Sequence, residues 1–313
     1  MQEIIMKEAL RVIDEYFRVR ELNELMKRAL ADKQEEKSTW SDIVLCSHYM
    51  FGGNSPDIHR VAANLELLIL ALDILDDLQD EDNVAKPWMV VPRATALNVV
   101  IGFIFAAFAD LGQTIAHHNG GEIAFFAIIG RLVTRSINGQ QIDLNNAINS
   151  EQEYLAMVHE KSGSLFRLAC TIGYTLAHLQ GRDTIERIDT VAEYAGVMAQ
   201  LNNDMRDVLR FDLKNDLLHK KKTLTTLFLL QHSEEDYPLF KQFYEGIATK
   251  EQFLQAKADI LEFIQNSGAI EYTKVIQTLY CNRASEAFAG LPGDEYWKGK
   301  FREIAIDPYS LQE

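Results

Sequence analysis

Apolar residues recur every three to four positions along most of the chain, the spacing that places them on one face of an α-helix. We find no convincing alternation of apolar and polar residues, the pattern typical of a half-buried strand. Capping chemistry indicates helix starts at four places: Ser55-Pro56, Ser150, Asp183 and Thr249. These patterns predict an all-α protein of about ten helices around a central cavity, folded as one domain over residues 1–313.

The most apolar segment, residues 94–110, is interrupted by Thr95 and Asn98 and ends at Asp110. It falls short of the ~20 apolar residues that span a bilayer. We therefore expect a buried core helix there. The N-terminus is amphipathic and carries several acids, which is not the pattern of a secretory signal.

The net charge of −15 argues against a nucleic-acid-binding protein, whose surface would be basic. It also disfavours electrostatic adhesion to an anionic membrane. The three cysteines are far apart and odd in number, so they predict neither a disulfide framework nor a paired metal motif. A reducing cytoplasm fits this cysteine usage best.

A first acidic cluster lies in residues 70–83, LALDILDDLQDEDN, directly after the apolar run of residues 65–72. Positions three and four apart share one face of a helix, so this segment carries a single acidic stripe formed by Asp73, Asp76 or Asp77, and Asp80. Like charges at these spacings repel one another unless a cation binds them.

A second, weaker cluster lies in residues 200–216, where Asn203, Asp204 and Asp207 share a face. Carboxylate and carboxamide oxygens are ligands suited to Mg²⁺, which also takes ligands from substrate phosphates. One such cluster alone is more often a charged helix end. Two that face each other across a cavity would form a metal-bridged diphosphate site.

Cationic residues accompany these clusters. Three lysines in a row, Lys220 to Lys222, follow the second cluster and could hold a diphosphate as point charges, although such a run alone is more often a solvated loop. Lys161 and Arg167 stand in an otherwise apolar helix, and a buried cation of this kind needs an anion.

The motifs, in this order, resemble the all-α isoprenyl diphosphate synthase family over roughly residues 35–230. The family's DDxxD motif resembles residues 76–80, and its second aspartate-rich motif resembles residues 199–207. Three further segments are similar to the family's GQ-L-DL, KTG and DLxxGKxT, namely residues 139–144, 161–163 and 216–223.

The resemblance implies an isoprenoid-synthase-type bundle in which two or three Mg²⁺ ions bridge the diphosphate of an allylic donor. It implies the metal ligands Asp76, Asp77, Asp80, Asn203, Asp204 and Asp207, of which the aspartates are the catalytic residues. It implies that the substrate is bound by Lys161, Lys221, Arg206 and Gln140. The apolar run 65–72 would wall the prenyl tunnel. Asp73 could extend the metal site or accept a hydrogen bond behind it.

The sequence departs from the family where a second diphosphate, that of isopentenyl diphosphate, would bind. The family's GGKRxRP corresponds to residues 35–41, where Lys37 remains but Ser38 and Trp40 replace the arginines. The later arginine pair is reduced to Lys86. Loss of bidentate arginine forks is not conservative at a phosphate site, so the second diphosphate has lost its place.

Within the family, the motifs are most similar to those of the tryptophan prenyltransferases of bacillus competence pheromones. The resemblance implies transfer of a geranyl or farnesyl group to a tryptophan of a small precursor peptide, with a role in quorum sensing and competence. It also implies a homodimer. Leu72 and Ala71, which stand before the first motif, are not bulky aromatic plugs, so either donor length could enter.

Three alternatives remain. A chain-elongating prenyl diphosphate synthase would need the missing arginines. A class I terpene cyclase would fit Asn203 and Asp207, but the last ligand of its motif would fall at Phe211. A catalytically dead partner subunit would have no need of the retained aspartates.

Overall fold

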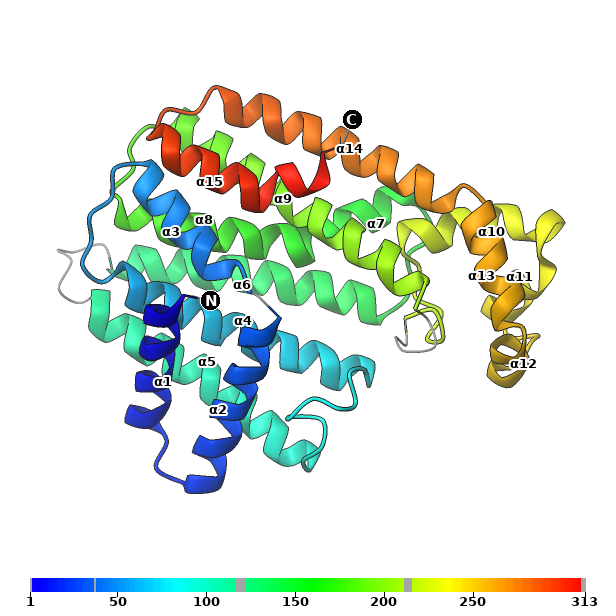
Figure 1. Ribbon diagram of the computed structural model, residues 1–313, viewed down its shortest axis with the longest axis horizontal. Coiled ribbons are helices and arrows are strands. Elements are labelled where there is room, and N and C mark those ends of the chain that lie inside the picture. The colour runs from blue at the N-terminus through cyan, green and yellow to red at the C-terminus, as the bar shows by residue number, and fades with distance from the viewer. Residues whose placement is uncertain (1, 37, 116–121, 211–215, 311–313) are drawn as a thin grey trace.

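The structure is a computed structural model that describes residues 2–36, 38–115, 122–210 and 216–310, and it is helical with no strand in these ranges (Figure 1). This confirms the predicted all-α class. The elements are α1 (Glu3–Tyr16), α2 (Arg20–Glu35), α3 (Trp40–Met50), α4 (Ile58–Asp80), α5 (Arg93–Ile115), α6 (Glu122–Leu144), α7 (Glu151–Val158), the π-helical turn η1 (His159–Gly163), α8 (Ser164–Leu176), α9 (Arg182–Val208), α10 (Leu224–Asp236), α11 (Pro238–Tyr244), α12 (Lys250–Gln255), α13 (Lys257–Asn266), α14 (Ala269–Ala289), α15 (Glu295–Ala305) and the 3₁₀ turn η2 (Asp307–Tyr309).

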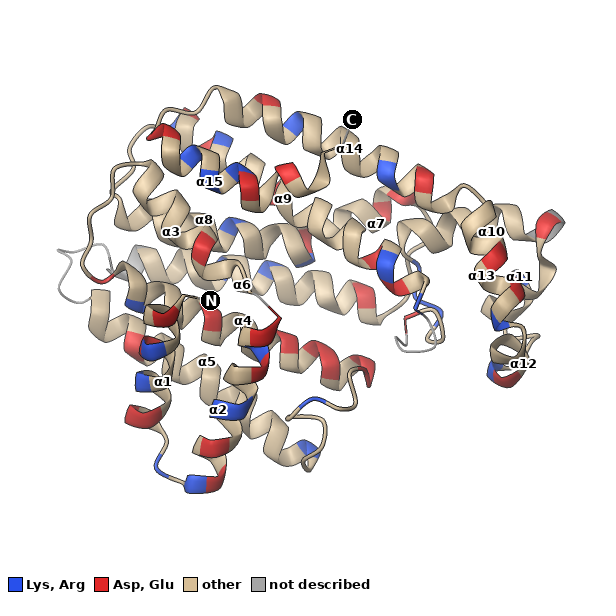
Figure 2. Cartoon of the chain, viewed as in Figure 1, with Lys and Arg blue, Asp and Glu red and all other residues tan. Residues whose placement is uncertain are grey.

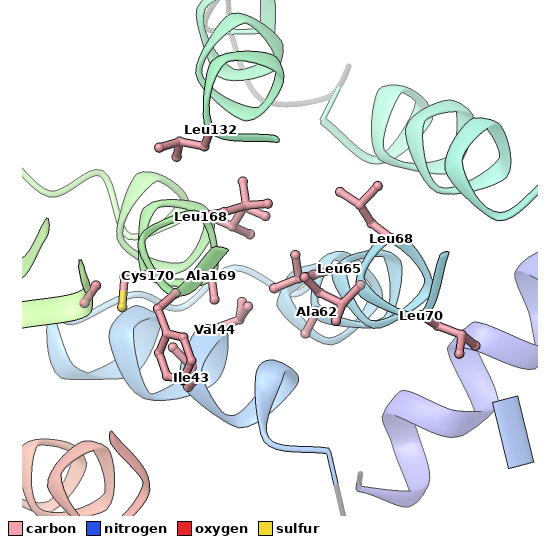
Figure 3. Close-up of a cluster of buried hydrophobic side chains, with 14 of the residues drawn as sticks. Ile43, Val44, Ala62, Leu65, Leu68, Leu70, Leu132, Leu168, Ala169 and Cys170 are labelled. Carbon is pink, nitrogen blue, oxygen red and sulfur yellow. The ribbon is translucent and has the colours of Figure 1, made fainter. Parts of the chain in front are cut away.

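Long helices form the body of the molecule. Helix α9 packs on α8 and α14, α4 packs on α5, and α3 packs on α8 (Figure 1). Figure 3 shows part of the core that they share, with Val44 of α3, Leu65 and Leu68 of α4, and Leu168 of α8 pointing toward one another. Each fully buried leucine contributes about 2 kcal/mol to folding, so this cluster holds the bundle together.

Helix α5 is the one helix in the described ranges that is long and apolar enough to cross a membrane by length and composition. One face of it is buried in the core, where Val99, Phe103 and Ala107 are fully covered. The prediction of a buried core helix is therefore confirmed for this face, whereas the expectation that the segment is too short to span a bilayer is wrong, because the helix runs over 23 residues. The opposite face is an exposed apolar stripe formed by Leu97, Ile101 and Phe105.

The chain between α9 and α14 is divided into short helices, and for this reason the prediction of about ten helices is too low. Pro238 begins α11, and Thr249 caps α12 with the capping box that the sequence predicted. Phe240, Phe243 and Phe253 form the centre of a separate small apolar cluster. A single domain over residues 1–313 stays a prediction.

The other predicted helix starts have mixed outcomes. Ser150 caps α7, where its side chain accepts a hydrogen bond from Glu153 N. Helix α9 instead begins at Arg182, because Gly181 turns the chain with φ +98°. Asp183 therefore lies in the first turn and is not the cap. Helix α4 begins at Ile58, just after the predicted Ser-Pro signal.

Candidate active site

One cavity of about 530 Å³ brings the two acidic clusters together. The end of α4 lines it on one side, and the C-terminal part of α9 lines it on another; Figure 2 shows the acidic residues along the C-terminal part of α4 in red. Of the site residues predicted from the sequence, those that line the cavity are Asp76, Asp77, Asp80, Gln140, Lys161, Asn203, Asp204, Asp207 and Lys221. Arg206 is exposed and is not among the lining residues, so the structure does not bring it to the site.

Asp76 and Asp80 are held by groups from distant parts of the chain. Asp76 Oδ1 accepts hydrogen bonds from Gln140 Nε2 at 2.7 Å and from Lys161 Nζ at 3.3 Å. Asp80 Oδ2 lies 2.5 Å from Lys221 Nζ. Burial and the charge of Asp76 raise the pKa of Asp80, although Lys221 opposes the shift. Both carboxylates therefore depend on a positive charge in the cavity.

Asp77 has a different environment. Its two oxygens accept hydrogen bonds from Asn83 Nδ2 at 2.6 Å and from Trp88 Nε1 at 2.8 Å. The loop after α4 returns to make these contacts through left-handed backbone conformations at Glu81 and Asn83, with φ of 53° and 51°. Such conformations are uncommon for residues other than glycine and cluster at functional sites. Asp77 thus anchors the loop that follows the motif.

Asp143 of α6 is a site residue that sequence reasoning did not assign. Its Oδ2 lies 2.9 Å from Lys161 Nζ and 3.4 Å from Lys221 Nζ, so it joins the two lysines. Burial opposes the shift, but the charges of both lysines lower the pKa of Asp143. The signal was present in the sequence, because Asp143 follows Gln140 by three residues and therefore shares its helix face.

Two glycines fix the position of Lys161, which lies on η1. A Cβ atom at Gly139 would lie 2.3 Å from Lys161 N, and one at Gly196 would lie 2.5 Å from Ser162 O. Only glycine lets α6 and α9 approach the turn so closely. Single π-helical turns of this kind are frequent at functional sites. Here the turn directs the Lys161 ammonium group to Asp76 and Asp143.

The three consecutive lysines separate in the structure. Lys221 is buried and reaches Asp80, Asp143 and, at 3.3 Å, Asp216. Lys220 Nζ lies 5.1 Å from the centroid of the Phe243 ring, and Lys222 Nζ donates to Asn149 Oδ1 at 2.7 Å. The lysine run therefore delivers one ammonium group to the cavity.

The α9 side of the cavity is built around Asp204. Its Oδ1 accepts a hydrogen bond from Gln200 Nε2 at 2.8 Å, and its Oδ2 accepts one from the buried Tyr154 hydroxyl. Burial raises the pKa of Asp204 to about 7, although both of these hydrogen bonds oppose the shift and the charge of Asp143 adds to it. The acids of α9 thus adjoin the lysines and carboxylates of the other wall.

The donor set fits a hard divalent cation. Carboxylate and carboxamide oxygens from two helices line one cavity, which is the ligand chemistry that Mg²⁺ prefers. Among the described residues, no three His, Cys, Asp or Glu side chains converge as a ready ion site, because the carboxylates are matched to lysines. The residues that could hold a cation are Asp76, Asp80, Asn203, Asp204 and Asp207.

The apolar part of the cavity differs from the prediction. Of the run 65–72, only Leu72 lines the cavity, while the residues before it lie in the core. This happens because α4 is covered on nearly every side, so its apolar residues pack against neighbouring helices. The apolar lining comes instead from Leu75, Ile137, Met157, Leu165, Phe166 and Trp40, whose ring centroid lies 4.8 Å from that of Phe166.

A second group of ion pairs lies at the edge of the cavity. Lys33 Nζ is 2.6 Å from Asp73 Oδ2 and 3.2 Å from Glu36 Oε2. Lys86 Nζ contacts Glu36 and lies 2.5 Å from Asp32 Oδ2. We call these five residues the rim cluster, and we call Asp76, Asp80, Asp143, Lys161 and Lys221 the inner cluster. Asp73, for which the sequence allows two possible roles, thus pairs with Lys33.

Two other residues singled out in the sequence have internal roles. Ser38, which stands at a lost arginine, donates a hydrogen bond to the buried Glu66 at 2.6 Å. Arg167 pairs with Asp189 and Glu193 at 2.7 and 3.0 Å and does not line the cavity. Lys37 and Phe211 lie outside the described residues.

Fold and site together define a prenyltransferase class. The chain belongs to the polyprenyl synthetase family, whose model matches residues 20–261. It is 28% identical over 294 residues to the tryptophan prenyltransferase ComQ of Bacillus subtilis (strain 168), covering 91% of this chain and 93% of that protein. The ComQ of Bacillus subtilis subsp. natto (strain BEST195) is 30% identical, with 89% and 85% covered. The structure of a polyprenyl synthase from Caulobacter crescentus CB15, solved with calcium and isoprenyl diphosphate, shares the fold with a TM-score of 0.81. Its sequence is 20% identical, and the match covers 99% of this chain and 96% of that one.

Proposed function

We propose that this protein transfers a geranyl or farnesyl group from its diphosphate to a tryptophan of a small pheromone precursor peptide, in the cytoplasm and with Mg²⁺. The observation that carries the proposal is that the cavity holds the groups for one diphosphate, whereas Ser38 and Trp40, at the lost arginines, make internal or aromatic contacts. Similarity to ComQ along almost the whole chain supports the same acceptor.

The inner cluster would hold the cation and the diphosphate of the donor. Lys161 and Lys221 are now neutralised by carboxylates. When bound, Mg²⁺ would offset the charge of the departing diphosphate. Asp76 and Asp80 would be among the residues that hold the cation. Lys161 and Lys221, which Asp143 also contacts, would donate to the diphosphate oxygens. Lys161, Lys221 and Gln140 are thus the diphosphate-binding side chains of the proposal.

The chemistry at the acceptor is a substitution. The C–O bond of the donor breaks and its electron pair leaves with the diphosphate, while π electrons of the indole form a new bond from C3 to the allylic carbon. Ring closure by the backbone nitrogen would release a proton, which the diphosphate can accept, so the step needs no strong protein base. Leu72, Leu165 and Phe166 would keep water from the allylic cation.

A homodimer is part of the proposal. The stripe of Leu97, Ile101 and Phe105 lies at four-residue spacing on one face of α5, and Phe105 is 70% exposed. Contiguous exposed apolar side chains mark interaction surfaces. A second copy of the chain that covers this stripe would remove it from water. Sedimentation of the wild type against Phe105→Glu tests this, and a monomeric wild type would overturn it.

The decisive experiment offers several acceptors in parallel. The protein is incubated with Mg²⁺ and geranyl or farnesyl diphosphate, together with either isopentenyl diphosphate or a tryptophan peptide, and products are read by mass spectrometry. We expect a peptide that gains one prenyl group, and no gain when phenylalanine replaces the tryptophan. A lengthened diphosphate would indicate an elongating synthase, and a free hydrocarbon would indicate a cyclase. Absence of all products would favour a partner subunit.

A further inference from the structure

The rim cluster lies on the same cavity as the inner cluster and is not used by the proposed chemistry. Lys33, Glu36 and Asp73 line the cavity, and Lys86 extends the cluster toward Trp88, whose ring centroid lies 5.6 Å from its Nζ. Of the two rim lysines, Lys33 therefore lines the cavity that a second substrate would share with the donor. Free ammonium groups there would attract an anionic co-substrate.

We propose that Asp73 and Glu36 are specificity-determining residues that keep a second diphosphate out of the cavity by holding Lys33 and Lys86 in ion pairs. The acceptor side then takes an uncharged aromatic group. This inference rests on the proposed function and assigns the reason for its choice of acceptor to named side chains.

The charges support this role. Two ammonium groups meet three carboxylates, of Asp32, Glu36 and Asp73, so the described rim carries one net negative charge. A diphosphate carries several negative charges and would gain no net attraction from such a surface. Discrimination by an unfavourable charge is a general device of specificity.

The pKa shifts at Lys33 and Glu36 favour their charged forms, whereas burial raises the pKa of Asp73 although Lys33 opposes that shift. Burial alone would lower the pKa of Lys33, but the charges of Asp73 and Glu36 outweigh it and the pKa is raised. Burial opposes the shift at Glu36 too, yet the hydrogen bond from Lys86 and the charge of Lys33 lower its pKa. The lysines are thus cations at neutral pH, and the neighbouring carboxylates neutralise their charge.

The test removes the two carboxylates and asks whether a second diphosphate then binds. The Asp73→Asn/Glu36→Gln variant is compared with the wild type and with Glu21→Gln/Glu35→Gln, which removes the same charge from exposed positions of α2. Each protein is loaded with Mg²⁺ and a non-reacting thio analogue of geranyl diphosphate. Isopentenyl diphosphate is then titrated by calorimetry.

We expect the rim variant to bind isopentenyl diphosphate at least about tenfold more tightly than either reference protein, about 1.4 kcal/mol. Equal binding by the rim variant and the charge-matched control would overturn the inference, as would tight binding by the wild type. Should the double variant fail to fold, Glu36→Gln alone is tested, because that side chain is 43% exposed. We expect the same direction with a smaller gain, and no gain would overturn the inference.

Failure of this inference is separable from failure of the proposed function. Prenylation of a tryptophan peptide by the wild type tests the proposed function and needs no rim variant. A wild type that prenylates the peptide, together with a rim variant that gains no binding, overturns only the inference. A rim variant that gains binding, in a protein that modifies no peptide, supports the inference and overturns the acceptor.

Discussion

The inner cluster and the rim cluster each contain two lysines and three carboxylates, and Lys221 of the inner cluster also lies 3.3 Å from Asp216. All of the inner cluster lines the cavity, whereas only Lys33, Glu36 and Asp73 of the rim cluster do so. Their surroundings differ. Asn203, Asp204 and Asp207 line the cavity from α9, and the charge of Asp143 reaches Asp204, so further oxygen donors adjoin the inner cluster. The rim cluster is bordered by the aromatic ring of Trp88. Under the proposed function, the inner carboxylates would bind a shared cation, whereas the rim carboxylates would keep their lysines.

If the proposed function holds, the composition of an ion-pair cluster does not fix its role. A carboxylate beside a lysine becomes a metal ligand only where other oxygen donors complete the coordination. Elsewhere the carboxylate neutralises its lysine, and the pair has little attraction for anions. The experiments that separate the two clusters are ordered by the size of their expected effects.

The largest effect is expected at the inner carboxylates. Asp80→Ala should lower the rate of peptide prenylation by about a thousandfold or more, because it removes a donor to the cation that balances the diphosphate. Asp76→Ala should act alike, with helix content by circular dichroism unchanged in both. In the wild type, Mg²⁺ with inorganic pyrophosphate should raise the melting temperature, and Asp80→Ala should lose that rise. Normal activity in either variant would refute the metal site.

A somewhat smaller effect is expected at the inner lysines. Lys221→Met should lower kcat/KM by about a hundredfold, since one buried charge on the diphosphate is lost. The controls come from the same run of sequence, because Lys220 and Lys222 point to Phe243 and Asn149. Lys220→Met and Lys222→Met should each stay within about twofold of the wild type. Equal losses in all three variants would show that the run acts as a general basic patch.

The fold and half of the site follow from the pattern of the sequence, for physical reasons. The helical class rests on the 3.6-residue period, and the clusters at the ends of α4 and α9 rest on residues three and four apart. Such local rules also predict an anionic partner for Lys161, because a buried cation needs an anion, and Asp76 and Asp143 are those partners. They cannot tell which of three adjacent lysines a loop turns inward, since that depends on the backbone around Lys221.

The remaining parts of the site depend on contacts between distant segments. Asp73 meets Lys33 from another helix, forty residues earlier, and no local spacing predicts that pair. The family resemblance implies that the apolar run 65–72 walls the tunnel, and hydropathy cannot correct this, because it does not distinguish a cavity wall from a core. The capping signal at Asp183 failed because Gly181, two residues earlier, already turned the chain.

A smaller effect is expected at Asp77, which belongs to the same motif as Asp76 and Asp80 but contacts the loop after α4. Asp77→Asn brings an amide donor against the Asn83 and Trp88 donors, so the loop after α4 should loosen. We expect a loss of about tenfold in kcat/KM, about 1.4 kcal/mol. Trp88→Phe removes one of the same hydrogen bonds and should give a similar loss. If kcat/KM of Asp77→Asn fell to that of Asp80→Ala while kcat/KM of Trp88→Phe stayed near that of the wild type, Asp77 would instead be identified as a metal ligand.

The smallest effect is expected in the stability of the rim. Lys86→Met breaks partly exposed ion pairs to Asp32 and Glu36, so it should lower the free energy of unfolding by about 0.5–1 kcal/mol at pH 7.

The pKa of Glu36 is lowered in the folded protein despite burial, mainly by its hydrogen bond from Lys86. Stability from a lowered carboxyl pKa is present above the unfolded value of about 4.3 and is lost as pH falls through the folded value. The gap in the free energy of unfolding between variant and wild type, measured by urea unfolding, should therefore shrink as the pH falls below about 4.3. Lys7→Met, on an exposed face of α1, should show no such gap. A gap that persists in acid would mean that Lys86 stabilises the rim by packing on Trp88 and not by its charge.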